Sequence, residues 1–368
     1  MDWSEDPREA HSRENPRKPG ARGSALGRYG GGGSTEGAVL RGLRWLKKTQ
    51  EPDGNWNPNS GGGDLKITNT VSVGLTGLAL LTFAGHGETD ASPEFGETVK
   101  KAVAWLLKQQ APDGSFGSKS YEHPIATFSL CEIHALTPTN SALAPALTNA
   151  VKLIVSGRNV EGGWDYAFAP TRRTDTSITG WCVQALKAAQ VAGLGGPDVD
   201  KVLKKALEAL LKNYAGDDTK GRFSYAGSTD PDLTGIGVLC CELIDYKHPL
   251  GIKGALAHLS EAEAFTWENV TWEKIYRWHF ATQAFFHVGG ELWKSWNKQF
   301  CLRLVKAQAI ESKAIEGPAI DGPGGRRYDI GYWDANNPKG GRVMDTALCI
   351  LMLEVYYRYP PVLLMGRD

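Results

Sequence analysis

The chain has 368 residues, with Lys plus Arg equal to Asp plus Glu at 41 each and a formal net charge of zero. No basic stretch exceeds a few residues, so the sequence lacks the electrostatic surface that nucleic-acid binding requires, and an apolar small molecule or a protein is the better expectation for a partner. The six cysteines form no CxxC pair, which predicts buried thiols in a reducing compartment.

The first 36 residues are rich in Arg, Glu, Pro and Gly and end near a run of four glycines at 30–33. Such a composition contributes little core, so residues 1–36 are predicted to be disordered or to wrap the surface, and 37–368 to form a single domain. The N-terminus has no apolar signal segment, and no uncharged run approaches the roughly 18 to 20 residues of a membrane span. We therefore expect a soluble, cytoplasmic protein without an integral membrane segment.

From Ala38 onward the sequence repeats a pattern in which a charged amphipathic helix ends at an acidic-Gly-aromatic turn and a more apolar helix follows. The first copy has a predicted helix over 39–50, the turn Pro52-Asp53-Gly54-Asn55-Trp56, and an apolar helix over 68–83. The other predicted helix pairs cover 99–110 and a segment from 125, 146–156 and 175–192, 199–214 and a segment to 245, 252–264 and 272–288, and 292–309 and 342–357. A long Gly/Pro loop is predicted within the last pair.

Six helix pairs at a period of roughly 50 to 60 residues indicate stacked supersecondary units, none of which buries its apolar face alone. The second helix of each pair is apolar on nearly all sides, so we expect an inner ring of helices inside an outer ring. The fold predicted is an all-α (α/α)6 toroid. An open solenoid is the alternative, and closure is favoured because neither terminal repeat has a plainly polar capping helix.

The turn segments resemble a known repeat. Residues 50–56 read Gln-Glu-Pro-Asp-Gly-Asn-Trp, residues 110–117 read Gln-Ala-Pro-Asp-Gly-Ser-Phe-Gly, and residues 161–164 read Glu-Gly-Gly-Trp. They resemble the QW-type repeats of squalene-hopene cyclases and of the β subunits of protein prenyltransferases, and the resemblance covers 38–359. It implies the toroid and a cavity suited to an isoprenoid-like ligand. Residues 278–357 resemble, more narrowly, bacterial proteins named for such repeats, which implies no activity.

Aligning the apolar helices on their small residues predicts one shared register for the ring. The common start positions are Asn69, Ile125, Asp175, Asp230, Trp278 and Arg342. The first, third and fourth of these are predicted to cap their helices with a side-chain oxygen. Positions two, six and nine after the start share one helical face, which is expected to line the cavity. The residues predicted to bind ligand there and nearby are Thr127, Cys131, Ser177, Trp181, Gln184, Trp278 and Phe280.

Residues 230–234 read Asp-Pro-Asp-Leu-Thr and resemble the Asp-x-Asp-Asp-Thr motif of squalene-hopene cyclases, whose middle aspartate donates the initiating proton. The resemblance implies that Asp232 is the acid of a terpenoid cyclisation. The shared register places His134 and His287 on the same predicted face, as further candidate catalytic residues. Protonating an alkene needs a strong, desolvated acid held by a second group. Leu233 replaces the next aspartate of the motif, and a capping turn is the alternative interpretation.

Cys131, His134, His287 and Asp232 are also of the residue types that hold zinc. The prenyltransferase β subunits bind zinc through an Asp-x-Cys pair and a histidine, and no Asp-x-Cys occurs in this sequence. No metal ligand is therefore assigned, no cofactor is predicted, and zinc remains an alternative.

Three functions remain open at this point. The leading hypothesis is a terpenoid-cyclase- or prenyltransferase-like toroid that binds an apolar, isoprenoid-like ligand, with Asp232 as the acid if the protein is an enzyme. One alternative is a non-catalytic binding or protein-interaction scaffold. The other is a carbohydrate-active toroid, although the sequence shows no convincing pair of facing carboxylates.

Overall fold

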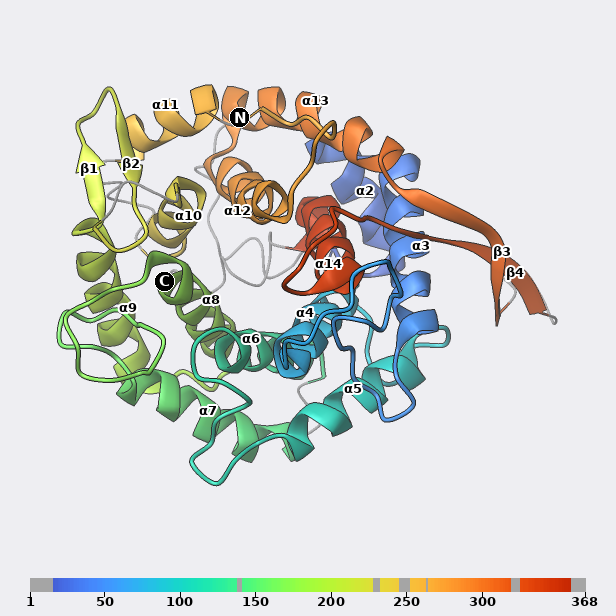
Figure 1. Cartoon of the computed structure of the whole chain (residues 1–368), viewed down its shortest axis with the longest axis horizontal. Helices are drawn as coiled ribbons and strands as arrows, with labels where there is room; N and C mark the ends of the chain where they lie inside the picture. Colours follow the sequence, from blue (N-terminus) through green and yellow to red (C-terminus); the bar gives the residue numbers. More distant parts are fainter. Residues whose placement is uncertain are drawn as a thin grey trace.

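Two concentric rings of helices form the body of the protein in the computed structural model, which describes residues 16–137, 141–227, 232–244, 252–262, 264–318 and 325–358 (Figure 1). The outer ring consists of α3 (Gly33–Thr49), α5 (Gly96–Lys108), α7 (Ala144–Ser156), α9 (Gly196–Leu211), α11 (Ile252–Ala262) and α13 (Gly290–Lys306). The inner ring consists of α4 (Ser72–His86), α6 (Glu122–Leu136), α8 (Thr176–Val191), α10 (Thr234–Ile244), α12 (Trp272–Val288) and α14 (Gly341–Leu353). Helix α14 packs against α4 and α3, so the ring is closed. The predicted (α/α)6 toroid is confirmed.

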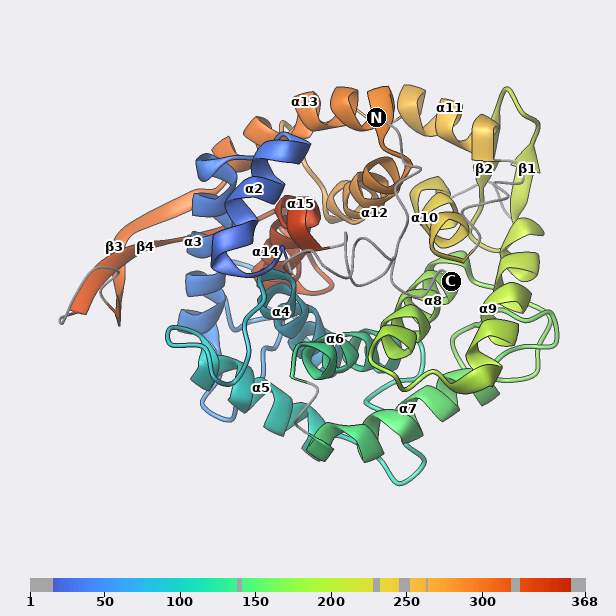
Figure 2. The same cartoon turned by 180° about the vertical axis from the view of Figure 1, so that it is seen from behind.

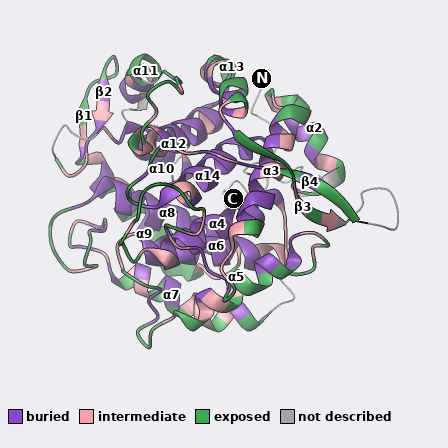
Figure 3. Ribbon diagram, turned by 45° about the vertical axis from the view of Figure 1, so that its right-hand side comes forward, coloured by how far each residue is buried: buried purple, intermediate pink, exposed green. Residues whose placement is uncertain are grey.

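The two rings differ in burial as their sequences predict. On α5 the buried side chains Val99, Ala102 and Leu106 recur every three or four residues, which turns one face to the core and leaves the other in water. On α4 every residue from Val73 to His86 is buried, because inner helices have neighbours on all sides. Figure 3 shows this contrast, with buried inner helices and exposed outer faces. None of the helices in the described ranges is long and apolar enough to cross a membrane.

The acidic-Gly-aromatic turns join the two rings. The indole N–H of Trp56 donates to the carbonyl of Leu46 in the last turn of α3 (2.9 Å), and its backbone N–H donates to the hydroxyl of Thr76 on α4 (3.0 Å). Gly54, with a φ of 103°, lies so close to the next outer helix that a Cβ would stand 2.5 Å from the carbonyl oxygen of Lys101. Gly114 and Gly162 approach Asn149 of α7 and Lys205 of α9 in the same way. These three turns thus contact the following outer helix, which explains the glycine at that position.

The same bond between the backbone N–H of the turn aromatic and an inner helix recurs around the ring and corrects the predicted register. The donor and acceptor pairs are Trp56 and Thr76, Phe116 and His123 Nδ1, Trp164 and Thr179, Phe223 and Thr234, and Trp333 and Thr346, at 3.0 to 3.2 Å. The predicted register is correct for α8, α10 and α14. It is wrong by three residues for α4 and by six for α6, where a histidine replaces the threonine.

The predicted caps have different outcomes. Asp175 is the N-cap of α8, and its carboxylate accepts hydrogen bonds from the backbone N–H groups of Ser177 and Ile178. Asn69 caps nothing, because α4 begins after Val71 and has no side-chain cap. Asp230 lies outside the described residues.

Two β-hairpins interrupt the helical pattern. Strands β1 (Tyr214–Gly216) and β2 (Gly221–Phe223) pair antiparallel between α9 and α10. Strands β3 (Ala309–Pro318) and β4 (Gly325–Tyr332) replace part of the loop predicted in the sixth unit and extend away from the ring (Figure 1). Strand β4 returns to the ring along α3, where the guanidinium of Arg44 lies 3.8 Å from the ring centroid of Tyr328. A 3-10 turn, η1 (Ser141–Leu143), precedes α7.

The N-terminal segment packs at the end of the ring where the inner helices finish. Helix α2 (Pro19–Tyr29) and the short α15 (Val355–Arg358) lie side by side there (Figure 2). Arg17 forms an ion pair with Glu132 (2.7 Å) and donates to the carbonyl of Ala84 (3.2 Å). The first outer helix begins at Gly33, six residues before the predicted start.

Candidate functional site

The inner helices run parallel to one another, because each follows an outer helix of the opposite direction, and their N-termini therefore share one end of the ring (Figure 1). Asp232 precedes α10 at this end. His287 is the fifteenth residue after the start of α12 at Trp272, which places it roughly 22 Å further along the axis. His134 is the twelfth residue after the start of α6, roughly 18 Å along. The structure thus does not bring the predicted acid and the two predicted histidines together.

Several predicted ligand residues belong to the core. The hydroxyl of Thr127 donates to the carbonyl of His123 in its own helix (2.8 Å), and the amide of Gln184 donates to the carbonyl of Gly180 (3.3 Å). Cys131 is fully buried, and burial raises the pKa of its thiol. Trp278 packs against Phe265 with 4.3 Å between ring centroids. Within the described residues no three or more His, Cys, Asp or Glu side chains are grouped as a metal site would require, so the zinc alternative gains no support.

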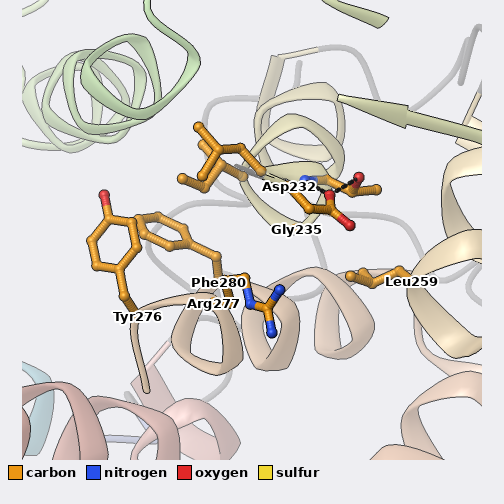
Figure 4. Close-up of a pocket in the computed structure, with 9 residues that line it drawn as sticks. Asp232, Gly235, Leu259, Tyr276, Arg277 and Phe280 are labelled. Atoms are coloured by element: carbon orange, nitrogen blue, oxygen red, sulfur yellow. Dashed lines mark hydrogen bonds between the residues drawn. The ribbon is translucent and has the colours of Figure 1, made fainter. Parts of the chain in front are cut away.

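A small pocket of about 10 Å³ lies beside Asp232, between α10 and α12. Its lining residues are Asp232, Leu233, Thr234, Gly235, Ile236, Leu259, Tyr276, Arg277 and Phe280 (Figure 4). The guanidinium of Arg277 rises from α12 on the side facing Asp232. The pocket has room for about one water molecule. An isoprenoid chain would not enter it in this conformation.

Three donors hold the carboxylate of Asp232. Its Oδ1 accepts from the backbone N–H (3.0 Å) and the hydroxyl (2.5 Å) of Thr234, and its Oδ2 lies 2.6 Å from Nε2 of His258 on α11. Burial favours the neutral acid, but the hydrogen bonds from Thr234 and His258 outweigh it and lower the pKa of Asp232. The carboxylate therefore stays ionised at neutral pH. An initiating acid needs the opposite shift, so this environment gives no support to the predicted proton donation.

A hydrogen-bonded aromatic network adjoins the pocket. The hydroxyl of Ser177 on α8 lies 2.8 Å from the phenol oxygen of Tyr276 and donates to that of Tyr121 (3.2 Å). The indole N–H of Trp181 donates to the same Tyr276 oxygen (3.0 Å), and Phe280 packs edge-on against both the Trp181 and the Tyr276 rings. Burial raises the pKa of Tyr121 and of Tyr276. Both phenols stay neutral and can donate as well as accept.

The network continues to an exposed rim. Tyr166 is 48% exposed, and its hydroxyl lies 2.7 Å from that of Tyr225. The guanidinium of Arg173 lies over both rings, 5.7 and 5.0 Å from their centroids, and forms an ion pair with Asp165. Beneath it, Oδ2 of the fully buried Asp175 lies 3.8 Å from the Arg173 guanidinium, and Tyr225 also interacts with this carboxylate. Burial raises the pKa of Asp175 against the opposing bonds to the helix N-terminus.

Asp232, Ser177, Trp181 and Phe280 were predicted from the sequence, whereas His258, Tyr121, Tyr166 and Tyr225 were not. Tyr121 was missed because of the register error in α6. With His123 in the place of Thr179, Tyr121 falls in the place of Ser177, two residues earlier, and the two hydroxyls meet. Tyr166 and Tyr225 lie on loops, and His258 lies on an outer helix, so inner-helix periodicity could not identify them.

The sequence comparisons support the repeat resemblance. No protein-family model matches the chain. It is similar to the squalene–hopene cyclase of Bradyrhizobium diazoefficiens, at 27% identity over 153 residues, which are 39% of this chain and 21% of that protein. The squalene–hopene cyclase of Zymomonas mobilis is 24% identical over 221 residues, 53% of this chain and 32% of that protein. The chain thus spans at most about a third of the length of these relatives. The resemblance to the squalene-cyclase repeat superfamily is confirmed.

The solved structures to which the chain is similar include an α-1,6-mannanase. The α-1,6-mannanase GH76A of Salegentibacter sp. HEL1_6 superimposes with a TM-score of 0.58 at 10% identity, over 88% of this chain and 98% of the mannanase chain. An inactive variant with two neighbouring aspartates replaced by alanine, in complex with α-1,6-mannotetraose, gives 0.57 at 9% identity, over 88% and 98% of the chains. Likeness at such identity shows the α/α-toroid fold alone.

This sequence has one pair of consecutive aspartates, Asp217-Asp218, in the turn between β1 and β2 at the periphery of the ring (Figure 1). Asp217 uses one carboxylate oxygen within that turn, where it accepts from Thr219 and from the backbone N–H of Lys220. Asp217 therefore stabilises its own turn.

Proposed function

We propose that this toroid binds a carbohydrate at the N-terminal end of its inner helices. The observation that carries the proposal is the linked set of Tyr276, Ser177, Tyr121 and Trp181, beside the pocket that Asp232 and Arg277 line. Sugars present hydroxyl groups around weakly apolar faces. Aromatic rings can stack on the apolar faces, while phenol hydroxyl groups, an indole N–H, a carboxylate and a guanidinium can form hydrogen bonds with the sugar hydroxyls.

The charge state of Asp232 defines what it would contribute. An ionised carboxylate accepts hydrogen bonds from sugar hydroxyls and stabilises positive charge, whereas glycoside hydrolysis also requires a protonated acid. The hydrogen bonds from Thr234 and His258 keep Asp232 in the ionised form. The proposal is therefore one of carbohydrate recognition, with Asp232 as a hydrogen-bond acceptor. It requires no catalytic step.

Two observations favour the second candidate, an isoprenoid-like ligand. The sequence is similar to squalene–hopene cyclases, and Trp181 and Phe280 present aromatic rings at the inner end of the site. Such a ligand would require a cavity larger than the pocket beside Asp232. A non-catalytic scaffold for a protein partner is the remaining alternative.

The deciding experiment is calorimetric titration of the purified protein with α-1,6-mannotetraose and a panel of other oligosaccharides. Tyr276→Phe removes one hydroxyl and should weaken binding about tenfold, which corresponds to one hydrogen bond of ~1.4 kcal/mol. Tyr29→Phe on α2, at the opposite end of the ring, is the matched control and should leave binding unchanged. Absence of binding to every oligosaccharide would overturn the proposal, and an isoprenoid found by mass spectrometry of the purified protein would favour the second candidate.

A further inference from the structure

The rim formed by Tyr166, Tyr225 and Arg173 extends beyond the pocket that the proposed function uses. Tyr166 is one of the few large side chains of its kind left substantially exposed, at 48%. Its position is nevertheless fixed, by the hydroxyl contact with Tyr225 and by the Arg173 guanidinium over its ring. An aromatic ring that is both exposed and held in place is preorganised for a flat ligand, because little side-chain entropy remains to be lost on binding.

The rim is continuous with the pocket. The rings of Tyr166 and Tyr121 meet edge to face with 6.0 Å between centroids. Tyr121 is joined through the Ser177 hydroxyl to Tyr276, which lines the pocket. Aromatic and hydroxyl groups therefore connect Tyr166 to Tyr276, and Tyr276 lines the same pocket as Asp232.

The charges of the rim balance locally. Arg173 forms ion pairs with Asp165 and, at 3.8 Å, with Asp175. The adjacent Glu161 pairs with both Arg172 and Lys212. These six side chains carry three positive and three negative charges when all are ionised. The rim therefore offers no surplus charge to attract an acidic or a basic ligand.

Asp175 interacts with both polar members of the rim. Its side chain is fully buried, Oδ2 lies 3.8 Å from the Arg173 guanidinium, and Tyr225 also interacts with the carboxylate. Arg173 and Tyr225 are therefore held by a buried carboxylate as well as by their contacts with each other.

Resting on the proposed carbohydrate site, we infer that the rim is a second sugar subsite and that the ligand is a neutral oligosaccharide longer than a single sugar. One sugar unit lies outside the Asp232 pocket, which has room only for a water molecule, and a further unit stacks on the exposed face of Tyr166. The occupant is neutral because the rim charges are paired, and it is a chain because the two regions are joined by a continuous aromatic path.

The test compares ligand lengths and charges by calorimetry, with mannose, α-1,6-mannotetraose and tetragalacturonate as probes. Wild-type protein should bind the neutral tetrasaccharide more tightly than mannose and more tightly than the acidic tetrasaccharide. Tyr166→Ala should weaken binding of the neutral tetrasaccharide roughly three- to tenfold and leave binding of mannose unchanged. Tyr166→Phe keeps the ring and should retain most of the affinity. Unchanged circular dichroism spectra would establish that both variants are folded.

The outcomes separate this inference from the proposed function. If the protein binds neutral sugars but Tyr166→Ala has no effect, or if mannose and the tetrasaccharide bind equally, the rim subsite is refuted and the carbohydrate site stands. Tighter binding of tetragalacturonate would refute the neutral ligand. If no sugar binds at all, the proposed function fails and the subsite fails with it.

Discussion

Replacing Thr179 by valine should destabilise the toroid by about 1–3 kcal/mol, the cost of a buried polar group left without its partner. The Thr179 hydroxyl accepts the backbone N–H of Trp164 at 3.1 Å, and both residues are fully buried, so water cannot replace it. Valine has nearly the same shape, so the packing around α8 would be conserved. The decrease in the free energy of unfolding would therefore measure the contribution of the hydrogen bond between the turn and the inner helix.

The control is Thr127→Val on α6, which is also fully buried. Its hydroxyl donates to the carbonyl of His123 in the same helix. After the substitution that carbonyl still accepts the backbone N–H of residue 127, so no buried group loses its last partner. We expect a change of less than about 1 kcal/mol there. Urea denaturation followed by circular dichroism would give both free energies of unfolding. A Thr179→Val variant no less stable than Thr127→Val would refute the idea that the turn bonds hold the rings together.

Two further predictions concern packing and pH. Gly180→Ala should destabilise the protein by about 1–3 kcal/mol, since a Cβ would stand 2.3 Å from Cγ2 of Ile236. Gly23→Ala on α2, where a Cβ would have no atom within 4 Å, should stabilise the protein by up to about 1 kcal/mol. The midpoint temperature of thermal unfolding should therefore fall for Gly180→Ala and rise for Gly23→Ala. Burial opposes ionisation of Glu36, but the hydrogen bond and charge of His86 outweigh it and lower the pKa from 4.5 to about 2. The stabilisation of the folded state by ionised Glu36 is fully present above pH 4.5 and is lost as the pH falls from 4.5 to 2. The difference in unfolding free energy between wild type and Glu36→Gln should therefore shrink over that range. A difference independent of pH would contradict the prediction.

The fold was predictable because several independent features of the sequence indicated the same arrangement of helices. The period of the repeat, the apolar inner helices and the turns around Trp56 and Trp164 all required two rings. The β3–β4 hairpin was not predictable as such. It is a feature of one repeat, and its Gly and Pro residues indicate a loop when taken alone.

The candidate site was only partly predictable. Ser177 and Trp181 were found because α8 carries the clearest register, and Tyr121 was lost because His123 performs the role of a threonine in α6, a substitution that residue type alone does not reveal. Asp232 was found by resemblance, but its ionised state depends on His258, which lies 26 residues later on another helix. Contacts between separate repeats of this kind follow from ring geometry and leave no local pattern in the sequence.

Closure of the ring also has a consequence for how the protein unfolds. In an open array of repeats the terminal units have one neighbour fewer and fray first. Here α14 packs on α4 and α3, so the sixth hairpin is a direct neighbour of the first and every hairpin has two. No repeat can detach without exposing the apolar sides of two others. The six hairpins should therefore lose hydrogen-exchange protection together, as one cooperative unit, despite the modular look of the sequence.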